Sequence, residues 1–265
     1  MHPKLCGSKH RLRPRPYPEE LRSTTTKVIL FSYTNYPSLI SNLEKEGVKM
    51  TQDDLLRHGS FTFDLQGVSR AASHQIVRHR IASFSQQSQR YVKITRSYGY
   101  LKPSGIPEDL KVPVEIHGER MELSFADVMD LTRQAEEGLV AAGIKAEDSR
   151  YLRPNAATTN IVMSMSPRQL IHFFNLRCAP DAQWEIRDVA WSMYGAVSLA
   201  APRVFGPLPA AEESEFVRKR VMLINELVQK QDAAFEKTPP GELFHLELSP
   251  QLDFSHPVES FVRRY

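Results

Sequence analysis

The stretch GVSRAASHQIVRHRIASFSQQSQRY, residues 67–91, decides how the first half of this chain is expected to fold. Gly67 ends a preceding run, FTFDLQ (61–66), in which large and polar residues alternate as they do on a half-buried strand. Ser69 then offers a side-chain oxygen to the free N–H groups of a helix, which we expect to continue to about Arg80. A polar loop follows the helix.

Outside this stretch the pattern predicts a few strands and then helices. KVILFSY (27–33) is a β-branched and aromatic run typical of a strand, and YVKI (91–94) is a shorter one. Helical spacing or capping residues predict helices over about 38–58, 124–142, 146–152, 166–177, 181–201 and 212–236, while 97–118 is expected to be irregular. Strands and helices that do not alternate favour a single compact α+β domain, mainly an antiparallel sheet packed with helices.

Composition limits the function classes. The chain has 265 residues and a net charge of only +3, so an anion site must come from local clustering of charge. Two cysteines make a disulfide framework improbable and fit a reducing, cytoplasmic location. Residues 1–26 are basic and proline-rich without an apolar signal core, and no apolar run reaches membrane-span length. We expect a flexible arm over 1–26, a catalytic domain over 27–237 and a C-terminal tail over 238–265.

The region between Asp64 and Glu108 contains no Asp or Glu. Its cationic and histidine side chains are Arg70, His74, Arg78, His79, Arg80, Arg90, Lys93, Arg96 and Lys102. Arginine forks suit phosphate, so these cations are expected to face an external anion or acids elsewhere in the chain. On the predicted helix, Gln75, Arg78 and His79 would share one face. The glutamines that follow can both donate and accept, as reading a pyrimidine edge requires.

A second polar pattern lies in SPRQLIHFFNLR, residues 166–177. Arg168, His172 and Asn175 fall at i, i+4 and i+7 on a helix that is otherwise apolar, and such a stripe needs hydrogen-bond partners. Taken alone, it is more typical of polar groups satisfied within the core than of ligand contacts.

Together these segments resemble the flavin-dependent thymidylate synthases, whose signature is R-H-R, seven residues, then S. Here it is Arg78-His79-Arg80 and Ser88, and DAQWEIR (181–187) extends the likeness, which covers about 61–200. The resemblance implies the fold of that family and the reductive methylation of dUMP to dTMP. The implied carbon donor is 5,10-methylenetetrahydrofolate, and NADPH is the reductant through FAD. It also implies a homotetramer with intersubunit active sites, with neither membrane nor nucleic acid as partner.

The resemblance assigns residues as well. Arg177 is the implied catalytic residue, because it would hold the pyrimidine edge and favour ionisation at N3. The implied dUMP contacts are Gln75, Ile76, Val77, Arg78, Gln86, Gln87, Ser88, Gln89, Arg90, Arg150 and Arg177, with 86–90 reaching in from a neighbouring subunit and Arg90 on the phosphate. The implied FAD contacts are Arg78, His79, Arg80, Gln86, Ser166, Arg168 and His172. No metal is expected.

Two departures from the family pattern leave alternatives open. Members usually carry H-x-S/T-P-x-E-H before the FTF strand, whereas this chain has TQDDLLRH (51–58) and keeps only His58. Many members have Asn where Ser166 stands. A degenerate synthase that binds dUMP without flavin therefore stays open. So does an RNA-binding module that stacks bases on Tyr91, Tyr98 and Tyr100.

Two further residues look like nucleophiles. Cys178 is interpreted as a buried structural thiol, and Ser88 as a hydrogen-bond donor to the nucleotide.

Overall fold

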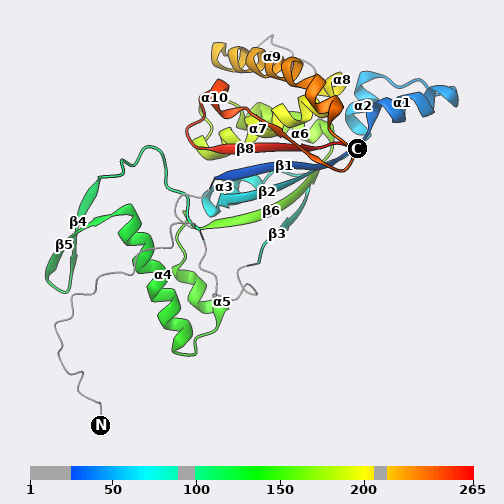
Figure 1. The fold of residues 1–265 in the computed structure, drawn as a ribbon. Helices are drawn as coiled ribbons and strands as arrows, with labels where there is room; N and C mark the ends of the chain where they lie inside the picture. The colour runs from blue at the N-terminus through cyan, green and yellow to red at the C-terminus, as the bar shows by residue number, and fades with distance from the viewer. Residues whose placement is uncertain (1–24, 89–98, 206–213) are drawn as a thin grey trace.

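The computed structural model describes residues 25–88, 99–205 and 214–265, and Figure 1 shows their arrangement. Its centre is a six-stranded sheet in the order β3-β6-β2-β1-β8-β7. The strands are β1 (Thr26–Tyr33), β2 (Phe61–Ser69), β3 (Ser83–Gln86), β6 (Thr158–Met165), β7 (Leu243–Leu246) and β8 (Val258–Arg263). All neighbours are antiparallel except β1 and β8. The expected α+β fold with a mainly antiparallel sheet is confirmed.

Alternation along the central strands gives the sheet one buried face. In β1, Val28 and Leu30 are buried, and in β2 Phe63 and Leu65 are buried, while the residues between them are more exposed. Val28 pairs with Leu65 and Leu30 with Phe63, so the buried side chains lie side by side on one face. The helices cover this face.

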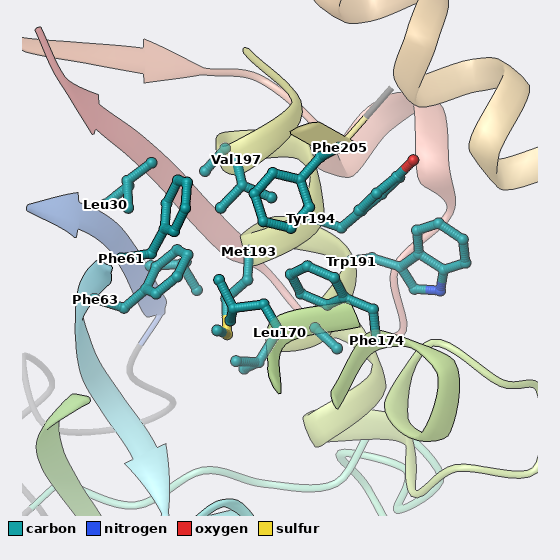
Figure 2. Packing of buried hydrophobic residues seen from close by; sticks show 14 of the residues in the cluster. Leu30, Phe61, Phe63, Leu170, Phe174, Trp191, Met193, Tyr194, Val197 and Phe205 are labelled. Carbon is teal, nitrogen blue, oxygen red and sulfur yellow. The ribbon is translucent and has the colours of Figure 1, made fainter. Parts of the chain in front are cut away.

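Three long helices supply the other half of the core: α6 (Pro167–Arg177), α7 (Trp184–Ala200) and α9 (Glu215–Lys237). In Figure 1, α6 and α7 lie on the sheet and α9 lies beyond them. Figure 2 shows Phe61 and Phe63 of the sheet facing Leu170, Phe174 and the side chains of α7. Because α6 is anchored through Leu170, Phe173 and Phe174, which are all fully buried, its opposite face is left for a site.

A separate group of elements projects from the sheet in Figure 1. It contains the β4 (Lys111–Ile116) and β5 (Glu119–Ser124) hairpin, α4 (Phe125–Ala141), α5 (Ala146–Ser149) and the 3-10 turn η2 (Arg150–Leu152). Ser124 and Asp127 form a capping box at the start of α4, as the sequence predicts for Ser124. The remaining helices are α1 (Tyr36–Lys45), α2 (Gln52–Arg57), α3 (Arg70–Ile76), α8 (Pro202–Phe205) and α10 (Ser249–Leu252).

Several expected elements differ in the structure. The predicted helix over 38–58 is two helices, and the helix expected over 181–201 begins at Trp184, with Gln183 as its cap. The segment 97–118, expected to be irregular, contains β4, and β3, β5, β6, β7 and β8 were not expected. Residues 238–265, expected to form a separate tail, supply β7 and β8 to the main sheet. The strand expected over 91–94, and residues 1–24 of the expected arm, lie outside the described residues.

Candidate active site

The start of α3 is fixed by its cap. The Ser69 hydroxyl accepts a hydrogen bond from the Ala72 backbone N–H at 3.0 Å, as predicted. The helix ends at Ile76 instead of Arg80, because the chain tightens into turns in which Arg78 N–H donates to Gln75 O and His79 N–H to Ile76 O. These turns bury His79 and leave Arg78 and Arg80 exposed.

Arg177 joins this turn from the end of α6. Its Nε–H donates to Nε2 of His79 at 2.8 Å, and its Nη1 donates to Oε1 of Gln75 at 3.4 Å. Residues of the two sequence motifs are therefore in contact, although about a hundred positions separate them. Three of the predicted site residues meet here.

His79 is held as a neutral acceptor. Burial, the positive charge of Arg177 and the nearby His172 together lower the pKa of His79 to about 4. Its ring packs against Phe173 at 4.7 Å between centroids and lies 6.3 Å from the His172 ring. Because Nε2 accepts from Arg177, the proton of the neutral ring belongs on Nδ1.

The polar stripe of α6 lies on the exposed side of the helix. Arg168, His172 and Asn175 are all exposed, so they are not polar groups satisfied within the core. Arg168 forms an ion pair with Asp53 of α2, and the same carboxylate also binds Arg57 at 2.7 Å. The segment TQDDLLRH (51–58), which differs from the family pattern, thus supplies a carboxylate to Arg168. Sequence reasoning did not identify Asp53, since nothing local signals its contact with α6.

Ser166 occupies the N-cap of α6, where its Oγ accepts from Gln169 N–H at 3.4 Å. This matches the predicted serine cap followed by proline.

The amide-rich loop begins on β3, at one edge of the sheet. Gln86 Nε2 donates to Ser73 Oγ of α3 at 3.3 Å, and Gln87 N–H donates to Asn160 O at 2.9 Å. Gln87 and Ser88 are exposed. Gln89 and Arg90 lie outside the described residues. The part of the loop that the structure describes therefore begins beside α3.

Arg150 lies near the other end of α3. Its Nε donates to Glu147 O at 3.1 Å. The pKa of Arg70, the first residue of α3, is lowered mainly by burial and further by the positive charge of Arg150. The structure does not place Arg150 beside Arg177 within one chain. Of the other implied dUMP contacts, Ile76 has its side chain fully buried in the core and Val77 is half-buried.

Cations dominate this surface. Among ion pairs between described residues, none involves Arg78, Arg80 or Arg177. Forked donors without local acids, beside a neutral imidazole and amides, suit a ligand with phosphate groups and a polar heterocycle. The residues present therefore fit FAD and a nucleotide.

Two other sequence expectations are settled by burial. Cys178 is a buried thiol at the C-cap of α6, in agreement with a structural role. Tyr100 is only 4% exposed and its ring lies 5.9 Å from that of Phe125, so it cannot act as a stacking platform for bases. Tyr91 and Tyr98 lie outside the described residues.

Within the described ranges, no three His, Cys, Asp or Glu side chains are grouped closely enough to hold a metal ion. In the same ranges, every helix is too short or too polar to cross a bilayer.

A family model described as "Thymidylate synthase complementing protein" matches residues 8–203. The chain belongs to this family. The flavin-dependent thymidylate synthase of Geobacter sulfurreducens is 45% identical over 158 residues, which cover 60% of this chain and 65% of that relative, slightly less than two thirds of its length. The enzyme of Clostridium tetani is 36% identical over 222 residues, covering 77% of this chain and 88% of the relative. The resemblance found in the sequence is confirmed.

The flavin-dependent thymidylate synthase of Sulfurisphaera tokodaii is 38% identical over 186 residues, which cover 68% of this chain and 67% of that relative. A crystal structure of thymidylate synthase X from Helicobacter pylori with FAD and dUMP aligns at a TM-score of 0.49 and 20% identity, over 68% of this chain and 97% of that one.

Proposed function

We propose that this chain is a flavin-dependent thymidylate synthase, which converts dUMP to dTMP. The observation that carries the proposal is the Arg177 guanidinium, which His79 and Gln75 hold without a carboxylate partner among the ion pairs described. The names of the relatives, which are 36–45% identical to this chain, support the flavin dependence. The finer parts, NADPH and 5,10-methylenetetrahydrofolate as co-substrates, rest on the family resemblance.

Arg177 would act on the pyrimidine electrostatically. With Nε engaged by His79, the remaining N–H groups of the fork can meet the pyrimidine edge. A fixed guanidinium there stabilises negative charge that spreads over N3 and the carbonyl oxygens, and this makes C5 more nucleophilic. Gln75 supplies an amide that can donate and accept beside the same edge. A cysteine nucleophile is then not needed.

FAD, when bound, would carry the hydride that the reductive methylation consumes. The residues proposed to hold it are Arg78, His79, Arg80, Gln86, Ser166, Arg168 and His172. Of these, Arg78 and Arg80 are exposed arginines suited to its pyrophosphate, and Ser166, Arg168 and His172 follow one another along α6. His79 would help through its neutral ring and its hold on Arg177.

We also propose a homotetramer in which 86–90 completes the site of a neighbouring subunit. The described part of this loop is exposed at the sheet edge, and Gln86 already lies beside α3. Arg150 would then approach the nucleotide of the same or a neighbouring site. Sedimentation should show a tetramer, and an active monomer would contradict this arrangement. The cytoplasmic location stays a prediction.

One observation favours a second candidate, a degenerate homologue that binds dUMP without flavin. Asp53 occupies Arg168, one of the arginines proposed to bind FAD. The absorption spectrum of the purified protein separates the two candidates. Flavin bands, or their appearance after FAD is added and the excess removed, support the synthase. Colourless protein that still binds dUMP would support the degenerate homologue.

A further inference from the structure

Glu185 is a buried acid that the proposed mechanism does not use. It lies in the first turn of α7 and is only 1% exposed. Both carboxylate oxygens bind one residue, Ser69. Oε1 accepts from the Ser69 backbone N–H at 2.6 Å, and Oε2 accepts from the Ser69 hydroxyl. A buried carboxylate is retained at a cost, so these two bonds need an explanation.

Ser69 makes this contact matter for the site. It is the N-cap of α3, and the same hydroxyl accepts from Ala72 N–H. Glu185 therefore grips α3 at its first turn, while the other end of α3 carries Gln75 and leads into His79. Because α3 is only 7 residues long, fixing its first turn also fixes the position of its last turn.

Glu185 is also tied to Arg177 through the chain. Arg177 ends α6, and α7 begins at Trp184 after a short connection. We propose that Glu185 is a positioning residue for the nucleotide site, which fixes α3 relative to Arg177 so that Gln75 and His79 meet the guanidinium. This inference rests on the proposed function, since it concerns how dUMP is held.

The chemistry of the contact suggests a conservative rescue. Burial raises the pKa of the Glu185 carboxyl, and the bonds from Ser69 act in the opposite direction. Glutamine could keep the geometry, because its carbonyl accepts from Ser69 N–H while its NH₂ donates to the Ser69 hydroxyl. Alanine removes both bonds.

Asp188 offers a matched control on the same helix. It is 2% exposed and lies three residues after Glu185. It binds the C-terminal segment instead of α3, accepting from Ser255 N–H at 3.0 Å and from His256 Nδ1 at 2.7 Å. Asp188→Asn thus perturbs a buried acid of α7 whose hydrogen bonds run to Ser255 and His256 and not to the α3 cap, although its charge also acts on Glu185.

The test measures two quantities, the KM for dUMP and the Kd for FAD, in wild type and in four variants: Glu185→Ala, Glu185→Gln, Ser69→Ala and Asp188→Asn. We expect Glu185→Ala to raise the dUMP KM by about 10-fold or more, because small misplacements of positioning groups are costly. The Kd for FAD should rise by less than the dUMP KM, because Arg78, His79 and Arg80 follow α3 and move with it, whereas the α6 contacts Ser166, Arg168 and His172 are anchored separately. In Glu185→Gln the dUMP KM should lie close to the wild-type value.

Ser69→Ala keeps the backbone bond and should give an intermediate rise in the dUMP KM, so it decides the question if Glu185→Ala does not fold. An unchanged dUMP KM in Ser69→Ala and Glu185→Ala would overturn the inference. So would an equal rise in Asp188→Asn, or equal losses of dUMP and FAD binding. A wild-type protein that binds neither dUMP nor FAD would instead reject the proposed function, and this is seen before any variant is made.

Discussion

Arg177 donates its Nε–H to Nε2 of His79, across 98 positions of sequence, at 2.8 Å. The contact fixes both partners, because the guanidinium loses a degree of freedom and the imidazole is confined to one tautomer. Among the described ion pairs, none joins Arg177 to an acid. Glu185 binds Ser69 instead, and the hydrogen bonds of Arg177 run to His79 and Gln75.

The first prediction concerns Arg177→Lys. The variant keeps the charge but loses the planar fork and the Nε–H that His79 accepts. We expect it to fold and keep FAD, and to lose most dTMP formation, by about 100-fold as for the removal of one electrostatic donor. Oxidation of NADPH by the flavin should survive better, since that half-reaction needs no activated C5.

Both activities should be measured on the same preparation of Arg177→Lys. Equal retention of dTMP formation and NADPH oxidation would reject the role assigned to Arg177. Arg177→Ala should in addition weaken dUMP binding.

The second prediction follows from the pKa of His79, which is about 4 in the folded protein against an ordinary 6.5. Between these values the unfolded chain binds a proton at His79 that the folded chain does not bind. The free energy of unfolding should therefore fall as pH drops from about 6.5 to about 4. In His79→Gln this component disappears, so the stability of wild type relative to the variant should shrink over that range.

Denaturant unfolding of both proteins at several pH values measures this difference. A wild-type-minus-variant difference that stays constant from pH 7 to 4 would show that His79 titrates alike in the folded and unfolded chains.

Many of the helices could be predicted, because the residues that cap a helix lie within a few positions of its ends. Ser124 with Asp127, and Ser166 with Pro167, are capping patterns readable from a few residues, and the structure has both helices where expected. Strands are different. β3 (Ser83–Gln86) is an edge strand with no buried residue, so it has no apolar alternation to detect. β6 alternates, with Ile161 and Met163 buried, but its partners β2 and β3 lie far away in sequence.

The sequence predicted those site residues that belong to the two motifs. It did not predict contacts that depend on how distant elements pack together. The resemblance named Gln75, His79 and Arg177, and the structure brings all three together. The ion pair of Arg168 with Asp53 depends on how α2 lies against α6, which no local pattern encodes. The assignment of Arg150 to dUMP stays a prediction.

The third prediction concerns the buried ion pair of Glu136 and Arg153. Arg153 Nε donates to both carboxylate oxygens, at 2.8 and 3.0 Å, and the two side chains are 1% and 7% exposed. Glu136→Ala leaves a buried guanidinium without this carboxylate and should lower the free energy of unfolding by about 3–5 kcal/mol. Chemical denaturation measures the loss.

The control for Glu136→Ala is Glu122→Ala. Glu122 faces Arg120 at 3.9 Å in the same group of elements, and both of these side chains are more than half exposed. Its removal should change stability by no more than about 0.5 kcal/mol. Similar losses in the two variants would mean that the buried pair contributes no more than a surface pair.

The last prediction concerns the C-terminal segment, which the sequence suggested was separable after Lys237. β8 pairs in parallel with β1, with Thr26 opposite Val258 and Leu30 opposite Val262, so it lies inside the sheet and not at its edge. Removing 238–265 takes away a set of buried side chains, Leu246, Leu248, Leu252, Val258 and Val262. Each such side chain contributes roughly 1.5–3 kcal/mol when fully buried, and their sum reaches the total stability of an ordinary domain, about 5–15 kcal/mol. We therefore expect the chain truncated after Lys237 to lose its cooperative thermal transition, followed by circular dichroism, and to bind neither FAD nor dUMP.

Deletion of Tyr265 alone is the control. This residue is 51% exposed, and its hydroxyl donates to Phe31 O at the end of the sheet, so its loss should lower the melting temperature only slightly. A truncated chain that still unfolds cooperatively would show that residues 27–237 form a domain on their own and that β7 and β8 are accessory strands.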